Sequence, residues 1–341
     1  MPAHPLVADL PLPAAPLWGA LAATPSGLHQ AVAQDVDEHA HNLTAWHQQY
    51  DQLGAGCFVG RLTEWRLPHI QVFREQTSQA LRQSCEVWAD SFWFGVPDPA
   101  ATLPTRINGR LHGSHDVMVR PGGERFDLVT PDRHSLFGVV VQRQALQDAA
   151  ARQGCHVDWD ALHQAEVLRV QEGARHACLN ALDGLLPLSE PHATGWHGAD
   201  LVAMEGAVLS LLLDLLDTSE ADTAVRQSVA RRQKVVAHAR EYVLAHPDQA
   251  VTVPELCERL HVSRRTLQYC FEEVMGLSPI QYLRAIRLNG ARRHLREAAR
   301  HGQGVQDVAA RWGFWHLSQF ALDYRKLFGE SPSDTLTRGA H

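Results

Sequence analysis

Two copies of one pattern, a pair of short helices joined by a tight turn, most constrain the fold of this chain. The copies occupy residues 252–275 and 305–328. In the first, Thr252 precedes a short helical run and Glu255 follows three residues later, which is the spacing of a capping box. Ser263 can cap the second helix of the pair. Two short helices with a tight turn form a helix-turn-helix, so the sequence predicts two such units.

The second helix of the first unit combines a buried face with a polar one. We expect its unit to have a small core made by Leu256, Leu260, Val262, Leu267, Phe271 and Val274. The outward stripe then consists of Arg264, Arg265, Gln268 and Tyr269, spaced three or four residues apart. Arginine and glutamine make bidentate contacts to guanine and adenine edges, so this stripe is a candidate for base reading.

A long arginine-rich helix is predicted between the two units. It begins at Ser278-Pro279 and ends near Arg300. At 1.5 Å per residue it would span roughly 30 Å, while adjacent major grooves on one face of DNA lie about 34 Å apart. We therefore expect it to space two reading heads, and we expect its arginines, including Arg287 and Arg292, to neutralise phosphates.

The charge of the chain supports this division. The 341 residues carry a net charge of −7, which alone argues against a nucleic-acid partner. From Arg226 onward, however, 18 Arg and Lys stand against 11 Asp and Glu, a net charge of +7, and the preceding residues carry −14. A basic module attached to an acidic one is therefore predicted. The composition is otherwise ordinary for a globular protein and excludes a fibrous or a wholly disordered chain.

The C-terminal segment resembles the DNA-binding domain of AraC/XylS transcription regulators. The matching residues cover about 100 positions in order: Val262–Leu267, Phe271, Gly276–Pro279, Arg287–Asn289, Val308-Ala309, Trp312–Phe314, Phe320, Tyr324–Lys326 and Phe328–Pro332. The resemblance implies a transcription activator with promoter DNA and RNA polymerase as partners. It also implies that a second head reads bases from His316, Leu317, Ser318, Gln319 and Leu322.

The second head departs from the pattern of the family. An arginine is common where Leu322 stands, and a small or polar residue is common where Trp315 and Leu317 stand. The second helix is therefore expected either to contact thymine methyl groups or to position the domain on the DNA backbone.

The first two thirds of the chain predict a separate α+β sensor. Residues 1–30 are rich in Pro and Ala and are expected to form a flexible arm. Residues 31–145 contain short apolar runs between Gly and Pro turns, which predict a cupin-like β-sandwich or barrel. One hairpin is expected over 117–129. Residues 146–225 are predicted to be a helical connector, and the domain of two helix-turn-helix units covers 226–341.

Within the connector, 159–182 and 199–217 have helical spacing, and 218–227 is a polar linker. The helix over 199–217 has one apolar face, formed by Leu201, Met204, Val208, Leu211, Leu212 and Leu215. Two interpretations remain open for that face. It packs on its own domain, or it forms a homodimer.

The acidic part, together with one run near the end of the chain, is similar at lower specificity to AraC/XylS regulators of ethanolamine-utilisation operons. The similarity lies in Trp46–Leu53, Ile70–Glu75, Ala80–Cys85, Ser91–Gly95 and Trp312–Leu317. It implies ethanolamine and adenosylcobalamin as effectors. A small ammonium needs an aromatic wall and a carboxylate. The candidates for effector binding are Trp46, Trp65, Glu75, Trp88 and Trp93, with Phe92, Phe94, Glu64 and Glu86 as further wall or charge residues.

Other chemistry finds little support in the sequence. The pair His39 and His41 lacks the downstream ligands of a cupin metal site, so no metal is expected. The six cysteines form no CxxC pair and are expected to be reduced thiols in a cytoplasmic protein that has no membrane span. No nucleophile and base are suitably arranged, so we expect no enzyme. Two rivals remain: a cupin-like metalloenzyme with a DNA-binding tail, and the same regulator with another effector, such as an aromatic acid or a choline-like amine.

Overall fold

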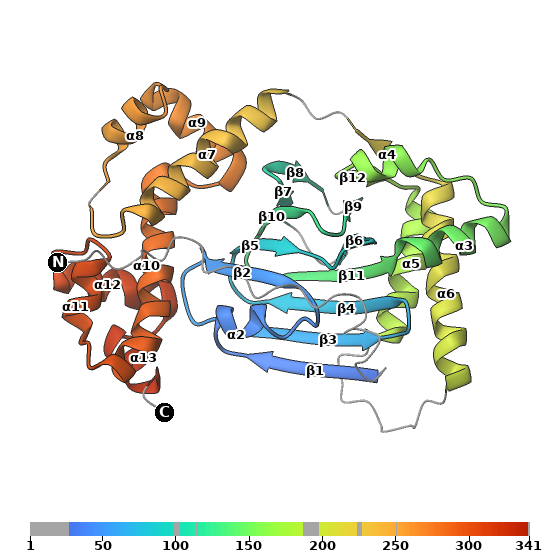
Figure 1. Ribbon diagram of the computed structural model, residues 1–341, viewed down its shortest axis with the longest axis horizontal. Coiled ribbons are helices and arrows are strands. Elements are labelled where there is room, and N and C mark those ends of the chain that lie inside the picture. Colours follow the sequence, from blue (N-terminus) through green and yellow to red (C-terminus); the bar gives the residue numbers. More distant parts are fainter. Residues whose placement is uncertain are drawn as a thin grey trace.

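Two antiparallel sheets and a layer of helices precede a helical domain that packs against one end of the sheets (Figure 1). The computed structural model describes residues 27–98, 103–113, 115–186, 198–223, 227–249 and 251–339. Most of the arm that we predicted over residues 1–30 lies outside this part of the chain. The prediction is wrong for the last four of those residues, because a strand begins at Gly27.

The larger sheet has eight strands. In spatial order they are β1 (Gly27–Ala33), β3 (Gly60–Arg66), β4 (Ile70–Thr77), β11 (His134–Gln142), β6 (Ser91–Pro97), β9 (Asp116–Pro121), β12 (Val167–Arg169) and β13 (Glu220–Asp222). The smaller sheet consists of β2 (His47–Gln52), β5 (Leu81–Glu86), β10 (Arg125–Thr130), β7 (Thr105–Ile107) and β8 (Arg110–His112). The two sheets face one another, as a β-sandwich requires, but they do not close into the cupin-like barrel that we predicted.

Strand alternation explains why the larger sheet is buried on both faces. Along β4, Ile70 and Val72 belong to one hydrophobic core, while Phe73 belongs to the other. Successive side chains of a strand point to opposite faces. The first core lies between the larger sheet and the helices, and the second lies between the two sheets.

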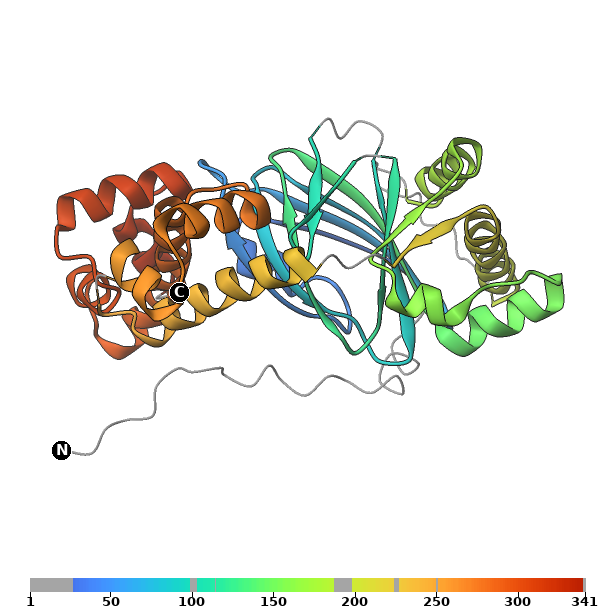
Figure 2. The same ribbon diagram turned by 90° about the horizontal axis from the view of Figure 1, so that it is seen from above.

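The helices over the outer face of the larger sheet are α3 (Arg143–Gln153), α4 (Trp159–Gln164), α5 (Glu172–Leu185) and α6 (Gly198–Asp217). Figure 2 shows them at the end of the molecule opposite the helical domain. Met204, Val208, Leu212 and Leu215 of α6 are buried in the core shared with α3 and α5. Its apolar face therefore packs on its own domain, and the alternative of a dimerisation helix loses its support.

Two elements of the N-terminal part differ from the prediction. The residues expected to form a hairpin over 117–129 are β9 and β10, which belong to different sheets. The connector contains two short strands, because the predicted helix over 159–182 is interrupted by β12, and β13 lies in the predicted linker and pairs with β12. The backbone hydrogen bonds gained along the edge of the sheet, from β9 to β12, outweigh the helical periodicity of this segment.

The C-terminal domain is all helical. Its elements are α7 (Gln227–Ala245), α8 (Val253–Arg259), α9 (Arg264–Met275), α10 (Pro279–Ala298), the 3-10 turn η1 (Ala299–His301), α11 (Val305–Arg311), α12 (Leu317–Phe328) and α13 (Pro332–Gly339). The helix α10 joins two small cores. Tyr282 and Ile286 pack in the core of α8 and α9, while Leu288 and Leu295 pack in the core of α11 and α12.

Candidate nucleic-acid interface

The first helix-turn-helix is built as its sequence predicts. The Thr252 side chain and Glu255 form the capping box of α8, and the Ser263 hydroxyl accepts the Thr266 amide at the start of α9. Between the helices His261 has a φ of 53°, a left-handed conformation that makes the turn tight. Leu267 and Phe271 of α9 are fully buried against Leu256 and the first half of α10. These contacts fix which face of α9 points outward.

The outward face of α9 carries the four residues predicted to read bases. Arg264 and Arg265 are exposed and make no ion pair with any other described residue. Gln268 is half-buried, and its amide donates to Glu272 over 2.6 Å. Tyr269 is 50% exposed. These two unpaired guanidinium groups lie in the first turn of the second helix, from which a helix-turn-helix presents side chains to base edges.

The second helix-turn-helix repeats this construction. Gly313 has a φ of 72° in the turn, at the place that His261 takes in the first unit. Phe320 and Tyr324 of α12 are buried, and Leu317 and Leu322 are 41% and 64% exposed. The other predicted residues of this head, His316, Ser318 and Gln319, are also exposed.

A position-by-position match between α9 and α12 adds one residue that the sequence analysis missed. Both helices have 12 residues, and the buried Leu267 corresponds to Phe320. In this register Gln268 falls on Ala321, which is exposed. Alanine carries no signal of its own in the sequence, and only the paired register of the two helices assigns Ala321 to the reading face.

Two arginines of α10 that we predicted to bind phosphates, Arg292 and Arg287, are not freely exposed. Arg292 is only 7% exposed, and its Nε lies 2.9 Å from Asp35 and its Nη1 2.5 Å from Glu330. Arg287 is half-buried and donates to the carbonyl of Gln249 over 2.5 Å. The prediction that Arg292 neutralises a phosphate is wrong, because its charge is already paired inside the protein.

Three acidic residues of the N-terminal part bind the arginines of α10. Asp35 also accepts from Arg296 over 2.5 Å. Arg293 donates to Asp37 and to Asp51, at 2.8 Å each. Burial alone would raise the pKa of Asp35, but Arg292 and Arg296 outweigh it and lower that pKa. The negative charge of the first part and the positive charge of the last part thus meet, in this state, at an interface within the protein.

Neutral hydrogen bonds extend the same interface. Asn289 of α10 is buried and exchanges two bonds with the backbone of Gln52, each 2.9 Å long. The side chain of Gln52 donates to the carbonyl of Leu327 at the end of α12 over 2.6 Å. Leu53, which follows β2 directly, packs against both cores of the helical domain. The contacts reach the C-terminal end of α12 and leave the outward residues of its first turns exposed.

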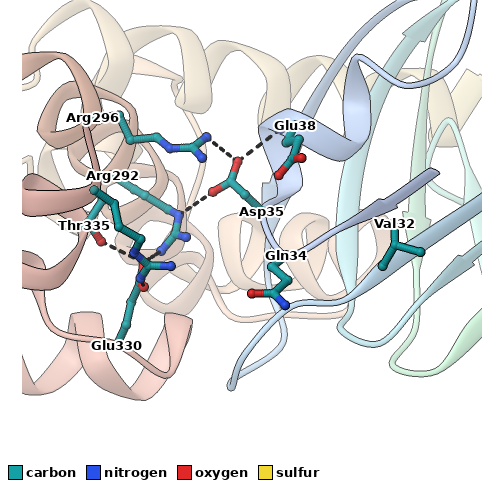
Figure 3. Close-up of a pocket in the computed structure, with 9 residues that line it drawn as sticks. Val32, Gln34, Asp35, Glu38, Arg292, Arg296, Glu330 and Thr335 are labelled. Atoms are coloured by element: carbon teal, nitrogen blue, oxygen red, sulfur yellow. Dashed lines mark hydrogen bonds and ion pairs between the residues drawn. The ribbon is translucent and has the colours of Figure 1, made fainter. Parts of the chain in front are cut away.

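A pocket of about 370 Å³ opens along this interface (Figure 3). Its lining combines acidic and basic side chains from both parts of the chain: Val32, Gln34, Asp35, Glu38, Arg292, Arg296, Glu330, Thr335 and Arg338. The charges pair with one another, since Asp35 bridges two arginines and Glu330 binds Arg292 and Arg338.

Of the five predicted effector residues, Trp65 lies apart from the other four. Trp46, Trp88 and Trp93 pack in the core between the two sheets. Trp46 and Trp93 lie edge to face, with ring centroids 6.1 Å apart. Trp65 instead belongs to the outer core and donates to the carbonyl of Leu185 over 2.8 Å. It therefore lies on the opposite face of the larger sheet.

Glu75 lies in a buried polar cluster on the inner face of β4. Its carboxylate accepts from the Tyr50 hydroxyl over 2.8 Å and lies 3.1 Å from His39 Nε2. Burial would raise the pKa of Glu75, but the hydrogen bonds from His39 and Tyr50 lower it below its ordinary value. Burial lowers the pKa of the nearby His134 to about 4. The interior thus favours the ionised form of the Glu75 carboxylate, and it keeps His134 neutral at pH 7.

Within the described ranges no group of three or more His, Cys, Asp or Glu side chains is arranged to hold a metal ion. No helix in the same ranges is both long and apolar enough to cross a bilayer.

Similarity to known proteins is strongest over the helical domain and extends beyond it. Residues 256–338 match the family profile described as "Helix-turn-helix domain". The probable thc operon regulatory protein of Rhodococcus erythropolis is 31% identical over 214 residues, 59% of this chain and 60% of the relative. The HTH-type transcriptional activator RhaR of Pectobacterium atrosepticum is 30% identical over 237 residues, 67% of this chain and 80% of the relative.

The first relatives are matched over only part of their own length. This chain spans less than two thirds of the length of the first three, at 60%, 23% and 39%. Among solved structures, the AraC-like transcriptional activator CuxR is 16% identical, with 83% of this chain and 100% of that chain covered at a TM-score of 0.39.

Proposed function

This chain belongs to the AraC/XylS family of transcription regulators, and from that premise we propose that it is an effector-responsive activator that binds promoter DNA with two heads. The outward helices α9 and α12 supply the heads, and α10 sets their separation. At 1.5 Å per residue, the 20 residues of α10 span about 30 Å, close to one turn of DNA. RNA polymerase is the proposed partner at the promoter.

One observation carries this proposal. Arg264 and Arg265 are exposed and unpaired with any described residue, although many arginines of the same domain are bound to carboxylates. An interior network that pairs the arginines of α10 and leaves these two free is consistent with a role for them outside the molecule. Bidentate contacts to guanine are the commonest specific contact of arginine in the major groove.

The test compares Arg265→Ala with a charge-matched control. Arg152 is exposed on α3, so Arg152→Ala removes the same charge far from the heads. The full-length protein first selects a DNA duplex from a random pool. The affinity of each variant for that duplex and for a scrambled one is then measured by fluorescence anisotropy. We expect Arg265→Ala to weaken specific binding by about 1–3 kcal/mol and Arg152→Ala to leave the preference for the selected duplex intact. Equal losses for Arg265→Ala on selected and scrambled duplexes would contradict base reading.

For the effector we propose a small amine, with ethanolamine as the first to test, bound near Glu75 in the core between the sheets. The support is chemical. Glu75 is an ionised, buried carboxylate, and Trp46 and Trp93 pack in the same core. A cation beside an aromatic face and a carboxylate is stabilised by both. Two of the relatives are named for other operons, thc and XylDLEGF, so the choice of ethanolamine rests on the sequence resemblance alone.

The residues described here do not fit adenosylcobalamin. The interfacial pocket of about 370 Å³ is near the lower limit for drug-sized ligands, and a corrinoid is much larger. The role of adenosylcobalamin as a second effector stays a proposal from resemblance.

A thermal-shift titration of the full chain tests the effector. Ethanolamine is added alone and with adenosylcobalamin, and choline and benzoate serve as other candidates. We expect ethanolamine to raise the Tm of the wild type but not of Glu75→Gln. Glu166→Gln, another buried carboxylate that is not a candidate for effector binding, is the control and should keep the response. A Tm that no concentration of ethanolamine raises would exclude it as the effector.

A further inference from the structure

The two reading faces differ in chemistry although they share one geometry. Aligned by their buried residues, α9 presents Arg264, Arg265, Gln268 and Tyr269, and α12 presents Leu317, Ser318, Ala321 and Leu322 at the same places. Two of the polar or charged side chains of the first head, Arg264 and Gln268, are thus replaced by apolar ones in the second.

The second head carries three large apolar side chains that are exposed. Leu322 is 64% exposed, Leu317 is 41% exposed, and Trp315, just before the helix, is 66% exposed. Leucine and tryptophan are usually buried, and an exposed cluster of them marks a surface that is covered in a complex. These exposed residues are not needed for the core of the unit. Phe320, Tyr324 and Leu327 fill that core from the opposite side of α12.

The polar residues nearby are less available for hydrogen bonds to bases. The Gln319 amide donates to Asp323 over 2.9 Å, and Asp323 also lies 3.3 Å from Arg284. Ser318 is the remaining exposed polar side chain in the first turn of α12. A head of this composition can supply van der Waals contact but few directed hydrogen bonds.

In the major groove, one group matches such a surface. Thymine carries a C5 methyl there, while guanine, adenine and cytosine present hydrogen-bonding edges at the groove floor. An apolar side chain laid on those polar edges would remove their water without replacing its hydrogen bonds. We propose that the second head selects thymine by contact of Leu317, Ala321 and Leu322 with its methyl groups. This inference rests on the proposed function, because it requires α12 to enter a major groove.

The two heads would then divide recognition. The first reads hydrogen-bonding edges through Arg264 and Arg265, and the second reads methyl groups. A selected site should accordingly contain one half rich in guanine contacts and one half with conserved thymines. The second contact should depend little on salt, since it pairs no charge.

The test removes the methyl groups and nothing else. A duplex is selected from a random pool by the full-length protein, and each thymine is replaced in turn by deoxyuridine, which lacks only the C5 methyl. Each methyl buried against the second head should contribute about fourfold in affinity, the equivalent of one buried methylene. Cytosine also lacks the C5 methyl group, so a duplex with cytosine at one of these positions should bind more weakly. Replacing that cytosine by 5-methylcytosine returns the methyl group and should restore the affinity.

The variant Leu322→Ala assigns the effect to α12. Because Leu322 is exposed, the substitution leaves the fold intact, and we expect it to abolish the difference between thymine and deoxyuridine at one or two positions. The matched control is Leu111→Ala, an equally exposed leucine on β8 at 56%, which should keep the full difference. If deoxyuridine binds as tightly as thymine at every position of the selected duplex, the proposal is overturned, and the apolar surface serves a protein partner or the DNA backbone. If no duplex is selected at all, the proposed function itself fails.

Discussion

Removing the charge of Asp35 tests whether the interface between the two parts of the chain is held by ions. Asp35 is 4% exposed, and its carboxylate bonds Arg292 and Arg296 at 2.9 and 2.5 Å. The same carboxylate caps α2 (Val36–Ala40), since it accepts the amides of Asp37 and Glu38 at 2.9 and 3.1 Å. Two substitutions separate these roles, because asparagine caps a helix nearly as well as aspartate.

The structure sets the size of each effect. Breaking a buried ion pair by removing one partner costs about 3–5 kcal/mol. Arg292 keeps Glu330 and Arg296 is 39% exposed on its side chain, so we expect Asp35→Asn to lower the free energy of unfolding by about 3 kcal/mol, at the low end of that range. Asp35→Ala also loses the cap and should cost about 1 kcal/mol more.

The assay is urea unfolding of the full chain followed by tryptophan fluorescence at pH 7. Asp90→Asn is the control, since Asp90 is exposed and its left-handed backbone accepts asparagine, and it should change the free energy of unfolding by less than about 0.5 kcal/mol. A double-mutant cycle of Asp35→Asn with Arg292→Gln should give a coupling of about 1 kcal/mol or more. If Asp35→Asn behaves like Asp90→Asn, the ionic interface does not hold the two parts together.

Three further predictions concern buried groups. The pKa of His134 is about 4 in the folded chain and near 6.5 when unfolded, so the unfolded state takes up the proton first as pH falls. Stability should drop by about 2 kcal/mol from pH 7 to pH 5 in the wild type, and His134→Gln should lack that part of the drop. Asn289→Ala leaves the buried amide and carbonyl of Gln52 unbonded, which should cost about 2 kcal/mol or more and speed hydrogen exchange at that amide; unchanged exchange would contradict the pairing. A Cβ at Gly290 would lie 2.1 Å from the Trp312 ring, so Gly290→Ala should destabilise by about 1–3 kcal/mol, and an unshifted Tm would refute this packing.

Local signals made the helical domain readable from sequence. The capping residues Thr252 and Ser263, and the left-handed Gly276, each stand directly next to the helix that they begin or end. A cap bonds to residues only a few positions away in the chain, so it can be recognised from the sequence directly. The exposed stripe on α9 followed from the same short-range periodicity.

Long-range contacts decided what the sequence could not predict. Arg292 has the same local pattern as an exposed phosphate-binding arginine, and only the folding of Asp35 against α10 buries it. Trp65 and Trp93 are equally apolar in sequence, but the strand order places them on opposite faces of the larger sheet. The split of β9 and β10 into two sheets likewise depends on partners far away in the chain.

The most direct test of a two-headed DNA-binding protein is a hydroxyl-radical footprint of the full chain on its selected duplex. Two protected patches should lie on one face of the DNA, about one helical turn apart, because we propose that α10, which is 20 residues long, spaces α9 and α12 by about that distance. Arg265→Ala should weaken one patch and Leu322→Ala the other. A single patch, or two patches that weaken together in both variants, would contradict the assignment of two independent reading heads.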